Sequence, residues 1–155
     1  MRFILTKELG RLSRWLRVLG FDTVYFKEEN YSKLLLLALR EERIIITRNK
    51  TLAERVTTKA VYLKEENLPE QLKKVIKRLN LKIEEDKMFS RCVICNKSLE
   101  KVGKEKVRER VPEYIYKTQQ GFRECPQCKR VYWPGSHWQN IREALNKTGL
   151  NEVCS

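Results

Sequence analysis

Four cysteines stand in two C-x-x-C pairs, a spacing typical of turns that bind a metal ion. Cys92 and Cys95 form the first pair, and Cys125 and Cys128 form the second. Each pair aims two thiolates at one point, so two pairs together complete a tetrahedron of sulfur ligands. We therefore predict one structural zinc site with no position open to water, which leaves the zinc ion no catalytic role. Two disulfides or four free thiols are the alternative.

Asn96 and Lys129 directly follow the two pairs. The turn around a C-x-x-C pair often ends in left-handed backbone, which asparagine tolerates better than most residues. The remaining cysteine, Cys154, is expected to be a spare thiol near the C-terminus. The single histidine, His137, is expected to pack at the start of a helix, with a phosphate or base contact as the alternative.

A second candidate site lies on the segment TKELGRLSRWLR, residues 6–17. On a helix of 3.6 residues per turn, the leucines of this region form one stripe and the arginines fall on the opposite side. Guanidinium groups bind phosphates in a bidentate manner, and an indole stacks on unpaired bases. We therefore predict RNA or DNA contacts from Arg11, Arg14, Trp15 and Arg17. The alternatives are an ordinary solvated face for the arginines and a partly buried core position for Trp15.

The composition supports a nucleic-acid partner for these side chains. The 155 residues include 33 Lys and Arg against 20 Asp and Glu, a formal net charge of +13. Such an excess favours a polyanion, either nucleic acid or an anionic membrane surface, whereas a lysine-rich surface balanced by glutamate stays near neutral. No apolar run is long enough to span a bilayer, and the N-terminus lacks the pattern of a signal peptide. We expect a cytoplasmic protein with reduced cysteines and no membrane partner.

Strand-like and helix-like segments alternate in the first half of the chain. Strands are expected at residues 2–6, 22–26, 43–47 and 60–63, and helices at about 8–19, 31–41, 49–57 and 68–80. This alternation is typical of βαβ units, so we predict an α/β domain with a mostly parallel sheet and flanking helices. Charge interrupts the pattern at residues 82–90. We therefore predict an α/β domain over residues 1–83 and a zinc ribbon with a C-terminal helix over 84–155, with 111–118 as one of its strands.

Three segments carry a resemblance to a known family. They are LGRLSRWLRVLGFDT, IIITRNKTLA and, most specifically, VPEYIYKTQQGFRECPQCKRVYWPGSHW. Over about residues 2–145 the chain resembles the Mut-seven C-terminal ribonuclease domain family, in which a PIN-like nuclease domain is fused to a zinc ribbon. The resemblance implies a PIN-like α/β fold for residues 1–82, a zinc ribbon with the four paired cysteines as ligands, and a role directed at RNA.

The chain departs from that family at the acidic positions that hold Mg²⁺ or Mn²⁺ in PIN-like nucleases. Where the family has an aspartate after the first strand, this chain has Thr6. The family's TRD motif reads TRN at residues 47–49, and the acidic pair that opens its second helix reads NY at 30–31. Neutral side chains bind hard cations poorly, because a site needs negative charge to offset the dehydration of Mg²⁺. We therefore predict a degenerate active site at Thr6, Asn30 and Asn49, with no catalytic residue and no bound Mg²⁺ or Mn²⁺.

These observations together predict an RNA-binding protein whose PIN-like domain is catalytically impaired, with the ribbon as a second contact surface. RNA or a ribonucleoprotein is the expected partner, and Arg48 is expected at the sheet edge where RNA enters. One alternative is a metal-dependent endoribonuclease that uses the nearby Glu8, Glu28 and Glu29. Another is a zinc-ribbon adaptor whose basic surface binds a protein.

Overall fold

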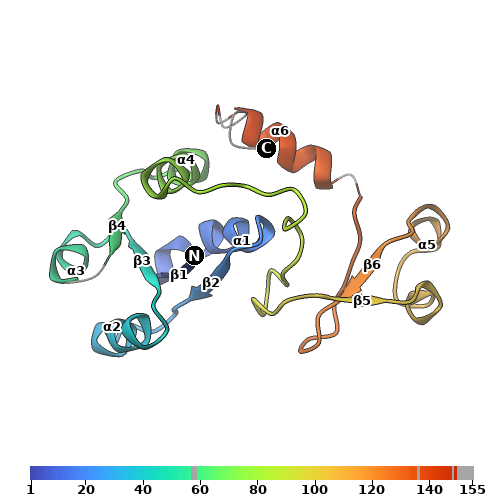
Figure 1. Ribbon diagram of the computed structural model, residues 1–155, viewed down its shortest axis with the longest axis horizontal. Helices are drawn as coiled ribbons and strands as arrows, with labels where there is room; N and C mark the ends of the chain where they lie inside the picture. The colour runs from blue at the N-terminus through green and yellow to red at the C-terminus, as the bar shows by residue number, and fades with distance from the viewer. Residues whose placement is uncertain (57–58, 136, 148, 150–155) are drawn as a thin grey trace.

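The computed structural model describes residues 1–56, 59–135, 137–147 and 149 (Figure 1). Its first part runs β1 (Arg2–Leu5), a 3₁₀ turn (Lys7–Leu9), α1 (Gly10–Val18), β2 (Asp22–Tyr25), α2 (Tyr31–Arg40), β3 (Ile44–Thr47), α3 (Lys50–Arg55), β4 (Ala60–Tyr62) and α4 (Leu68–Leu79). The strands are parallel and pair in the order β2-β1-β3-β4. The predicted α/β architecture with a parallel sheet and flanking helices is therefore confirmed.

Helices cover both faces of this sheet because side chains alternate along each strand. Phe3 and Leu5 of β1 join the leucines of α1 and α4 in one buried cluster. Ile4 points to the opposite face and packs with Leu34 of α2 and Leu52 of α3. Figure 1 shows the same arrangement, with α1 and α4 on one side of the strands and α2 and α3 on the other. The α/β part is thus a three-layer structure with two cores.

The second part is a small antiparallel sheet with its own core. Strands β5 (Glu100–Val102), β6 (Phe122–Glu124) and β7 (Val131–Tyr132) pair in that order. A 3₁₀ turn (Lys104–Val107) and α5 (Glu113–Thr118) lie between β5 and β6. The core of this part consists of Val107, Val111, Ile115 and Phe122. The predicted small zinc-ribbon fold after the α/β part is confirmed, and we call this part the ribbon.

The predicted strand at residues 111–118 is wrong, because this segment contains the helix α5. Pro112 precedes the helix with an extended backbone, and Glu113 pairs with Lys117 one turn later at 3.1 Å. Tyrosine and isoleucine favour strands, but this preference depends on a half-buried, pleated surface. Ile115 is the one buried residue of α5, and a single helical turn is enough to bury it.

The C-terminal helix α6 (His137–Lys147) packs on the α/β part. Leu145 of α6 lies in the same core cluster as Ile83 and Met88 of the segment that leads into the ribbon. Figure 1 shows α6 beside α4. The predicted roles of the His137 side chain and of Cys154 lie outside the part of the chain that the structure describes.

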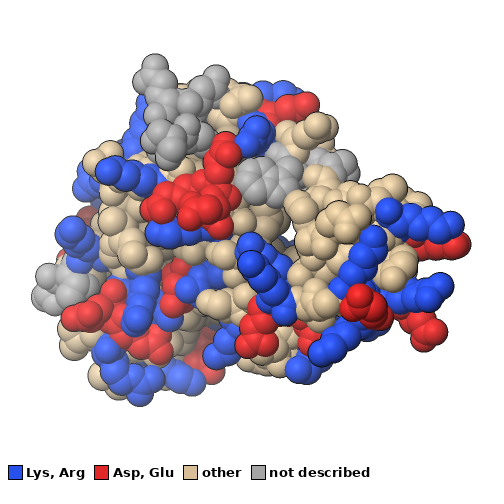
Figure 2. All heavy atoms as spheres, turned by 45° about the vertical axis from the view of Figure 1, so that its right-hand side comes forward, with Lys and Arg blue, Asp and Glu red and all other residues tan. Residues whose placement is uncertain are grey.

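The surface carries both signs of charge. Figure 2 shows a face on which Lys and Arg side chains alternate with Asp and Glu side chains in small groups. A surface region lined by cations alone therefore stands out against this background. In the described ranges, no helix is both long and apolar enough to cross a membrane.

Candidate metal centre and nucleic-acid interface

The first C-x-x-C pair lies on a tight turn that we call the first knuckle (residues 92–97). The Cys92 N–H donates to the Lys97 carbonyl at 2.8 Å, and the Asn96 N–H donates back to the Cys92 carbonyl at 2.9 Å. The Cys95 N–H donates to the Cys92 sulfur at 3.4 Å. Asn96 has the predicted left-handed conformation, with a φ of 63°. These bonds fix the positions of both thiols on one turn.

The second C-x-x-C pair lies on a matching turn, the second knuckle (residues 125–130). The Cys125 N–H donates to the Arg130 carbonyl at 2.9 Å, and the Lys129 N–H donates to the Cys125 carbonyl at 3.0 Å. The Cys128 N–H donates to the Cys125 sulfur at 3.5 Å. Lys129 is also left-handed, with a φ of 64°. The two knuckles therefore have the same backbone hydrogen bonds.

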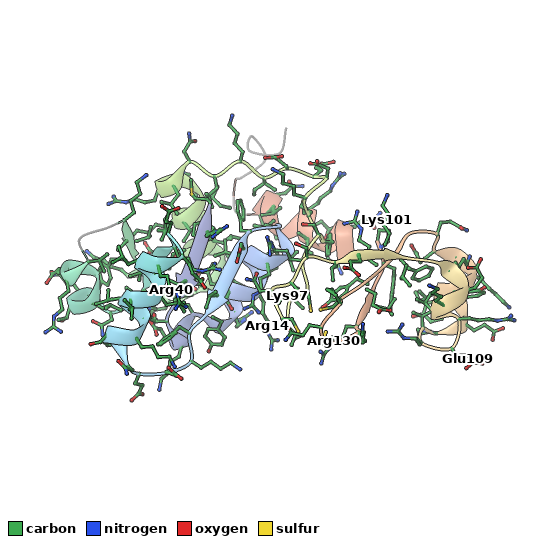
Figure 3. All side chains as sticks on the ribbon, turned by 60° about the horizontal axis from the view of Figure 1, so that its bottom comes forward. Arg14, Arg40, Lys97, Lys101, Glu109 and Arg130 are labelled. Atoms are coloured by element: carbon green, nitrogen blue, oxygen red, sulfur yellow. The ribbon has the colours of Figure 1, made fainter. Side chains whose placement is uncertain are left out.

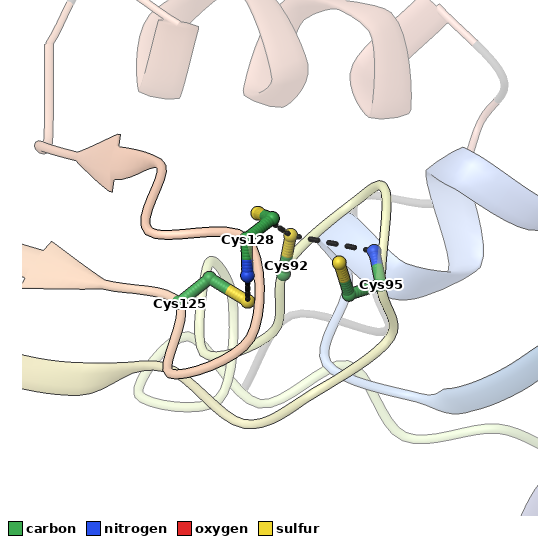
Figure 4. Close-up of side chains that lie close together, drawn as sticks. All are labelled: Cys92, Cys95, Cys125 and Cys128. Atoms are coloured by element: carbon green, nitrogen blue, oxygen red, sulfur yellow. Dashed lines mark hydrogen bonds between the residues drawn. The ribbon is translucent and has the colours of Figure 1, made fainter.

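The two knuckles bring their four sulfur atoms together (Figure 4). All four lie within 4.8 Å of one another, and the sulfurs of Cys92 and Cys128 are 3.6 Å apart. A tetrahedral zinc ion bound at ~2.3 Å by four thiolates holds them about 3.8 Å apart. The cluster therefore has the donors and the spacing that zinc requires, and it is consistent with a zinc ribbon.

The electrostatics of the thiols favour a cation between them. Partial burial and neighbouring sulfurs raise the pKa of Cys95 to about 12. Burial acts in the same direction on Cys128, but hydrogen bonds from Arg130 outweigh it and lower the pKa of that thiol to about 6. A divalent cation removes this conflict because it stabilises all four thiolates at once.

Arg17 joins the first knuckle to the α/β part. Its side chain is buried, with 8% of the residue surface exposed. Its Nε donates to the Thr23 carbonyl at 2.9 Å, and its Nη1 donates to the carbonyls of Val93 at 2.9 Å and Ile94 at 3.1 Å. The prediction that Arg17 lies on an outward face of α1 is therefore wrong, because the first knuckle covers the last turn of this helix.

Asn96 makes a second joint between the same two regions. Its side-chain amide donates to Asp22 Oδ1 at 2.7 Å, and its Oδ1 accepts the Thr23 N–H at 3.0 Å. Arg43 donates to the same Asp22 oxygen at 2.8 Å. Burial raises the pKa of Asp22, but the hydrogen bonds from Arg43 and Asn96 outweigh it and hold that pKa below its usual value. Because β2 is an edge strand, these contacts also occupy an open sheet edge.

A groove of about 460 Å³ lies between α1, the end of β2 and the first knuckle. We call it the basic groove, because its lining includes Arg11, Arg14, Arg17 and Lys27 but no carboxylate. Tyr25, Val93 and Ile94 supply its apolar walls. Figure 3 shows Arg14 at the junction of the α/β part and the ribbon, where Lys97 and Arg130 of the knuckles also lie. The charge of this groove suits an anionic ligand.

Two further predicted contact residues lie outside the lining of the basic groove. Trp15 is half-buried and packs against the core cluster that α1 shares with α4, so the alternative of a core position describes its contacts. Arg48 is exposed directly after β3, and its Nη2 donates to the Lys64 carbonyl at 3.3 Å. Arg48 thus lies at the expected sheet edge, and its contact with RNA stays a prediction.

The carboxyl ends of β1 and β3 meet where the strand order reverses, which is where open α/β sheets bind ligands. The buried Thr6 hydroxyl donates to Glu8 Oε1 at 2.6 Å and lies 2.9 Å from the Thr47 hydroxyl. The same Glu8 oxygen accepts the Arg48 N–H at 3.0 Å. Partial burial raises the pKa of Glu8, but these hydrogen bonds outweigh it and lower that pKa. Glu8 is therefore an ionised carboxylate already engaged by neutral donors.

Asn30 and Asn49 cap the helices that follow them. Asn30 Oδ1 accepts the Lys33 N–H at 3.1 Å, and Asn49 Oδ1 accepts the Leu52 N–H at 3.0 Å. Asparagine and aspartate are equally good at this position, so the capping bond survives while the negative charge does not. The Asn49 amide also donates to the Tyr31 hydroxyl at 3.2 Å.

Two of the three glutamates considered as substitutes lie on the loop between β2 and α2 and pair with lysines. Glu28 lies 2.9 Å from the Lys33 amine, and Glu29 lies 2.5 Å from the Lys7 amine. Glu8 is the one of the three that contacts the hydroxyls at the strand ends.

The Mut7-C RNAse domain family matches residues 1–145, which include the parallel sheet, the ribbon and most of α6. The chain belongs to this family. No curated protein and no solved structure matches the sequence. In this Mut7-C chain, the four cysteines are the one cluster within the described residues whose His, Cys, Asp or Glu side chains are close enough to hold a metal ion.

Sequence reasoning missed some residues of the basic groove and of the bonds that join the first knuckle to the α/β part. Lys27 and Tyr25 complete the basic groove, and their position directly at the end of the second strand is a signal that could have placed them. The joints made by Arg17 and Asn96 cross more than seventy residues of sequence, and no local pattern reveals them.

Proposed function

We propose that this Mut7-C chain binds RNA and that its ability to cleave RNA is impaired. The observation that carries the proposal is the contrast between two places in the molecule, the basic groove and the carboxyl ends of β1 and β3. The basic groove gathers four cations and no carboxylate, whereas the strand ends carry hydroxyls and amides where an RNase of this family needs acidic groups. We further propose that the cysteine cluster holds one zinc ion with a structural role.

Two exposed arginines support the binding half of the proposal. Arg11 and Arg14 lie one helical turn apart on α1 and both line the basic groove. Guanidinium groups bind phosphate in a bidentate manner and stay charged at any physiological pH. The apolar walls next to them offer a surface on which bases can rest while the phosphates meet the arginines.

The geometry around Glu8 supports the other half of the proposal, that cleavage of RNA is impaired. Activation of water by Mg²⁺ or Mn²⁺ needs several oxygen ligands with enough negative charge to replace the hydration shell. Oε1 of Glu8 already accepts hydrogen bonds from the Thr6 hydroxyl and the Arg48 N–H. Asn49 is engaged as a helix cap. The strand ends therefore supply less charge than hydrolysis through a metal requires.

Binding can be tested with a fluorescein-labelled oligouridylate of about twelve nucleotides, measured by anisotropy over a range of salt. We expect the zinc-loaded chain to bind it with a steep salt dependence. Changing Arg11→Gln and Arg14→Gln together should weaken binding and flatten the slope of log affinity against log salt by about 1.4, because each lost contact with single-stranded RNA removes about 0.7. An unchanged slope in this double variant contradicts the proposal and favours the protein-adaptor alternative.

The matched control is the double variant Arg40→Gln with Arg78→Gln. It removes the same charge from two exposed arginines on α2 and α4, outside the basic groove. General attraction by net charge alone predicts equal losses for the two double variants. Contacts in the groove predict a larger loss for the Arg11 and Arg14 pair.

Cleavage is tested on the same RNA with Mn²⁺. We expect the parent protein to leave the RNA intact, and the pair Thr6→Asp with Asn49→Asp to raise the affinity for Mn²⁺, as measured by calorimetry. Cleavage by the parent that disappears in Glu8→Gln contradicts the impaired-site proposal and establishes the endoribonuclease alternative.

A further inference from the structure

Arg17 connects three features that the proposed function treats separately. Its buried guanidinium holds the carbonyl groups of Val93 and Ile94, which lie between the two cysteines of the first knuckle. The same two residues form a wall of the basic groove, and Arg17 itself lines that groove. The side chain therefore touches the metal-binding turn and the proposed RNA surface at once.

Other contacts place the first knuckle rigidly against the α/β part. Asn96 bonds to Thr23 and Asp22, and the Phe89 N–H donates to the Val18 carbonyl at 2.8 Å. Arg91 Nε donates to the Gly20 carbonyl at 3.3 Å. Because Val93 and Ile94 belong to the first knuckle, the position of this knuckle sets the position of that wall of the groove.

We propose that Arg17 is a positioning residue through which the zinc-bound first knuckle completes the RNA-binding groove, so that zinc and RNA each strengthen the binding of the other. The proposal rests on the proposed function, since it needs RNA in the basic groove. A knuckle without its metal loses the sulfur cross-links that hold its shape, and the carbonyls that hold Arg17 then lose their fixed positions.

The sign of the effect separates this proposal from simple electrostatics. A zinc ion bound by four thiolates carries a net charge of −2, which repels a phosphate chain. Electrostatics alone therefore predicts that zinc weakens RNA binding. Positioning by Arg17 predicts that zinc strengthens it.

Coupling between two ligands is reciprocal, which supplies the test. The affinity of the full chain for zinc is measured by competition with a chromogenic chelator under reducing conditions, with and without saturating fluorescein-labelled oligouridylate. We expect RNA to raise the zinc affinity of the parent by about tenfold, and zinc to raise the RNA affinity by the same factor. A parent whose RNA binding is unaffected or weakened by zinc overturns the inference and leaves the proposed function intact.

Arg17→Lys is the decisive variant, because it keeps the charge but loses the planar fork whose Nε holds the Thr23 carbonyl while its Nη1 holds the knuckle carbonyls. We expect the effect of RNA on zinc affinity to fall below about twofold, a loss that a purely structural role does not produce. If this variant fails to fold, Asn96→Gly breaks the second joint and is compatible with the left-handed backbone at that position.

Lys129→Gly is the control, since it introduces glycine at the equivalent left-handed position of the second knuckle. It should keep the coupling of the parent. Full coupling in both Arg17→Lys and Asn96→Gly overturns the inference. A zinc-loaded parent that does not bind the RNA even at low salt overturns the proposed function, and with it this inference.

Discussion

The two knuckles share a motif, a set of backbone hydrogen bonds and one left-handed residue, yet they differ in what surrounds them. Asn96 is the left-handed residue of the first knuckle, and its side chain is bonded to Asp22 and Thr23 of the α/β part. Lys129 is the left-handed residue of the second knuckle, and its amine lies 3.9 Å from Glu124 on the surface of the ribbon. The first knuckle is therefore bonded to the α/β part as well as to the ribbon, whereas the bonds described for the second knuckle lie within the ribbon.

The difference shows that local sequence determines the turn while tertiary contacts determine its role. Each knuckle consists of one N–H donated to sulfur, two backbone hydrogen bonds and one left-handed residue, all within a few positions of the chain. Among the described residues, only the first knuckle is bonded to a buried guanidinium and a carboxylate of the α/β part, those of Arg17 and Asp22. A symmetric metal site is therefore attached asymmetrically to the rest of the chain.

Loss of a zinc ligand should have the largest effect, and it should be equal for the two knuckles. Cys92→Ser and Cys125→Ser each remove one of four thiolates from a shared ion, and structural zinc contributes about 10–16 kcal/mol to the folding of such sites. We expect zinc content, measured by mass spectrometry of the metal, to fall from about one per chain to near zero in both variants. Hydrogen exchange should show loss of protection over residues 90–135 while β1–β4 stay protected.

Retention of zinc in one of these variants but not in the other contradicts a shared ion. In that case the knuckles differ in the metal site itself as well as in their attachment. Unfolding of the α/β part in both variants contradicts its independence from the ribbon.

Removal of the carboxylate behind the first knuckle should have an intermediate effect. Asp22 accepts hydrogen bonds from Arg43 and Asn96, so Asp22→Asn should destabilise the protein at pH 7 by about 2–3 kcal/mol. The folded-state pKa of Asp22 is lowered, so its contribution is present above the unfolded value of about 3.9 and is lost as pH falls through the folded value. Urea unfolding should show the difference between parent and variant shrinking below about pH 4.

Glu124→Gln is the counterpart at the second knuckle. Glu124 is bonded to Arg110 at 2.6 Å, and this arginine is 38% exposed, whereas the Arg43 that pairs with Asp22 is 8% exposed. Solvent therefore screens the pair at Glu124 more strongly, and it should contribute less to stability. Equal losses for Asp22→Asn and Glu124→Gln contradict the asymmetry between the knuckles.

The contrast between the knuckles also explains which features of the structure could be predicted from the sequence. The parallel sheet, the cysteine cluster and the left-handed Asn96 and Lys129 follow from patterns within a few residues, and the structure confirms them. A helical wheel puts Arg17 on an outward face because it contains no information about a turn that begins far along the chain. The propensity of tyrosine and isoleucine predicts a strand at residues 111–118 and does not reveal the helix that begins after Pro112.

At the strand ends, too, the sequence predicts some features of the candidate site and not others. Thr6 and Asn49 could be aligned with acidic positions of the family, and the carboxyl ends of parallel strands bring such positions together. That Glu8 folds back onto both hydroxyls depends on the 3₁₀ turn after β1, whose geometry the leucine stripe of α1 does not reveal.

The smallest expected effect concerns a tyrosine hydroxyl that contacts the first knuckle. Tyr132 follows the second knuckle, but its hydroxyl lies 3.1 Å from the Cys92 sulfur and accepts the Val93 N–H at 3.3 Å. Burial and the nearby Cys92 sulfur raise the pKa of Tyr132, so this group stays protonated and can donate to a metal-bound thiolate. The residue at the same distance after the first knuckle is Leu99, which has no hydroxyl to offer Cys125.

We expect Tyr132→Phe to lower the affinity for zinc by about tenfold, or roughly 1.4 kcal/mol, because hydrogen bonds to metal ligands typically contribute 10–100-fold. Competition with a chromogenic chelator measures this change, and Tyr114→Phe is the control, since Tyr114 is 68% exposed on α5. The loss should be constant from about pH 7 to pH 9, because a hydroxyl with a raised pKa remains a donor throughout that interval. An unchanged zinc affinity in Tyr132→Phe means that the Cys92 thiolate needs no donor from β7. The two knuckles are then equivalent as metal ligands. They differ in that case only in the contacts by which Arg17 and Asn96 attach the first knuckle to the α/β part.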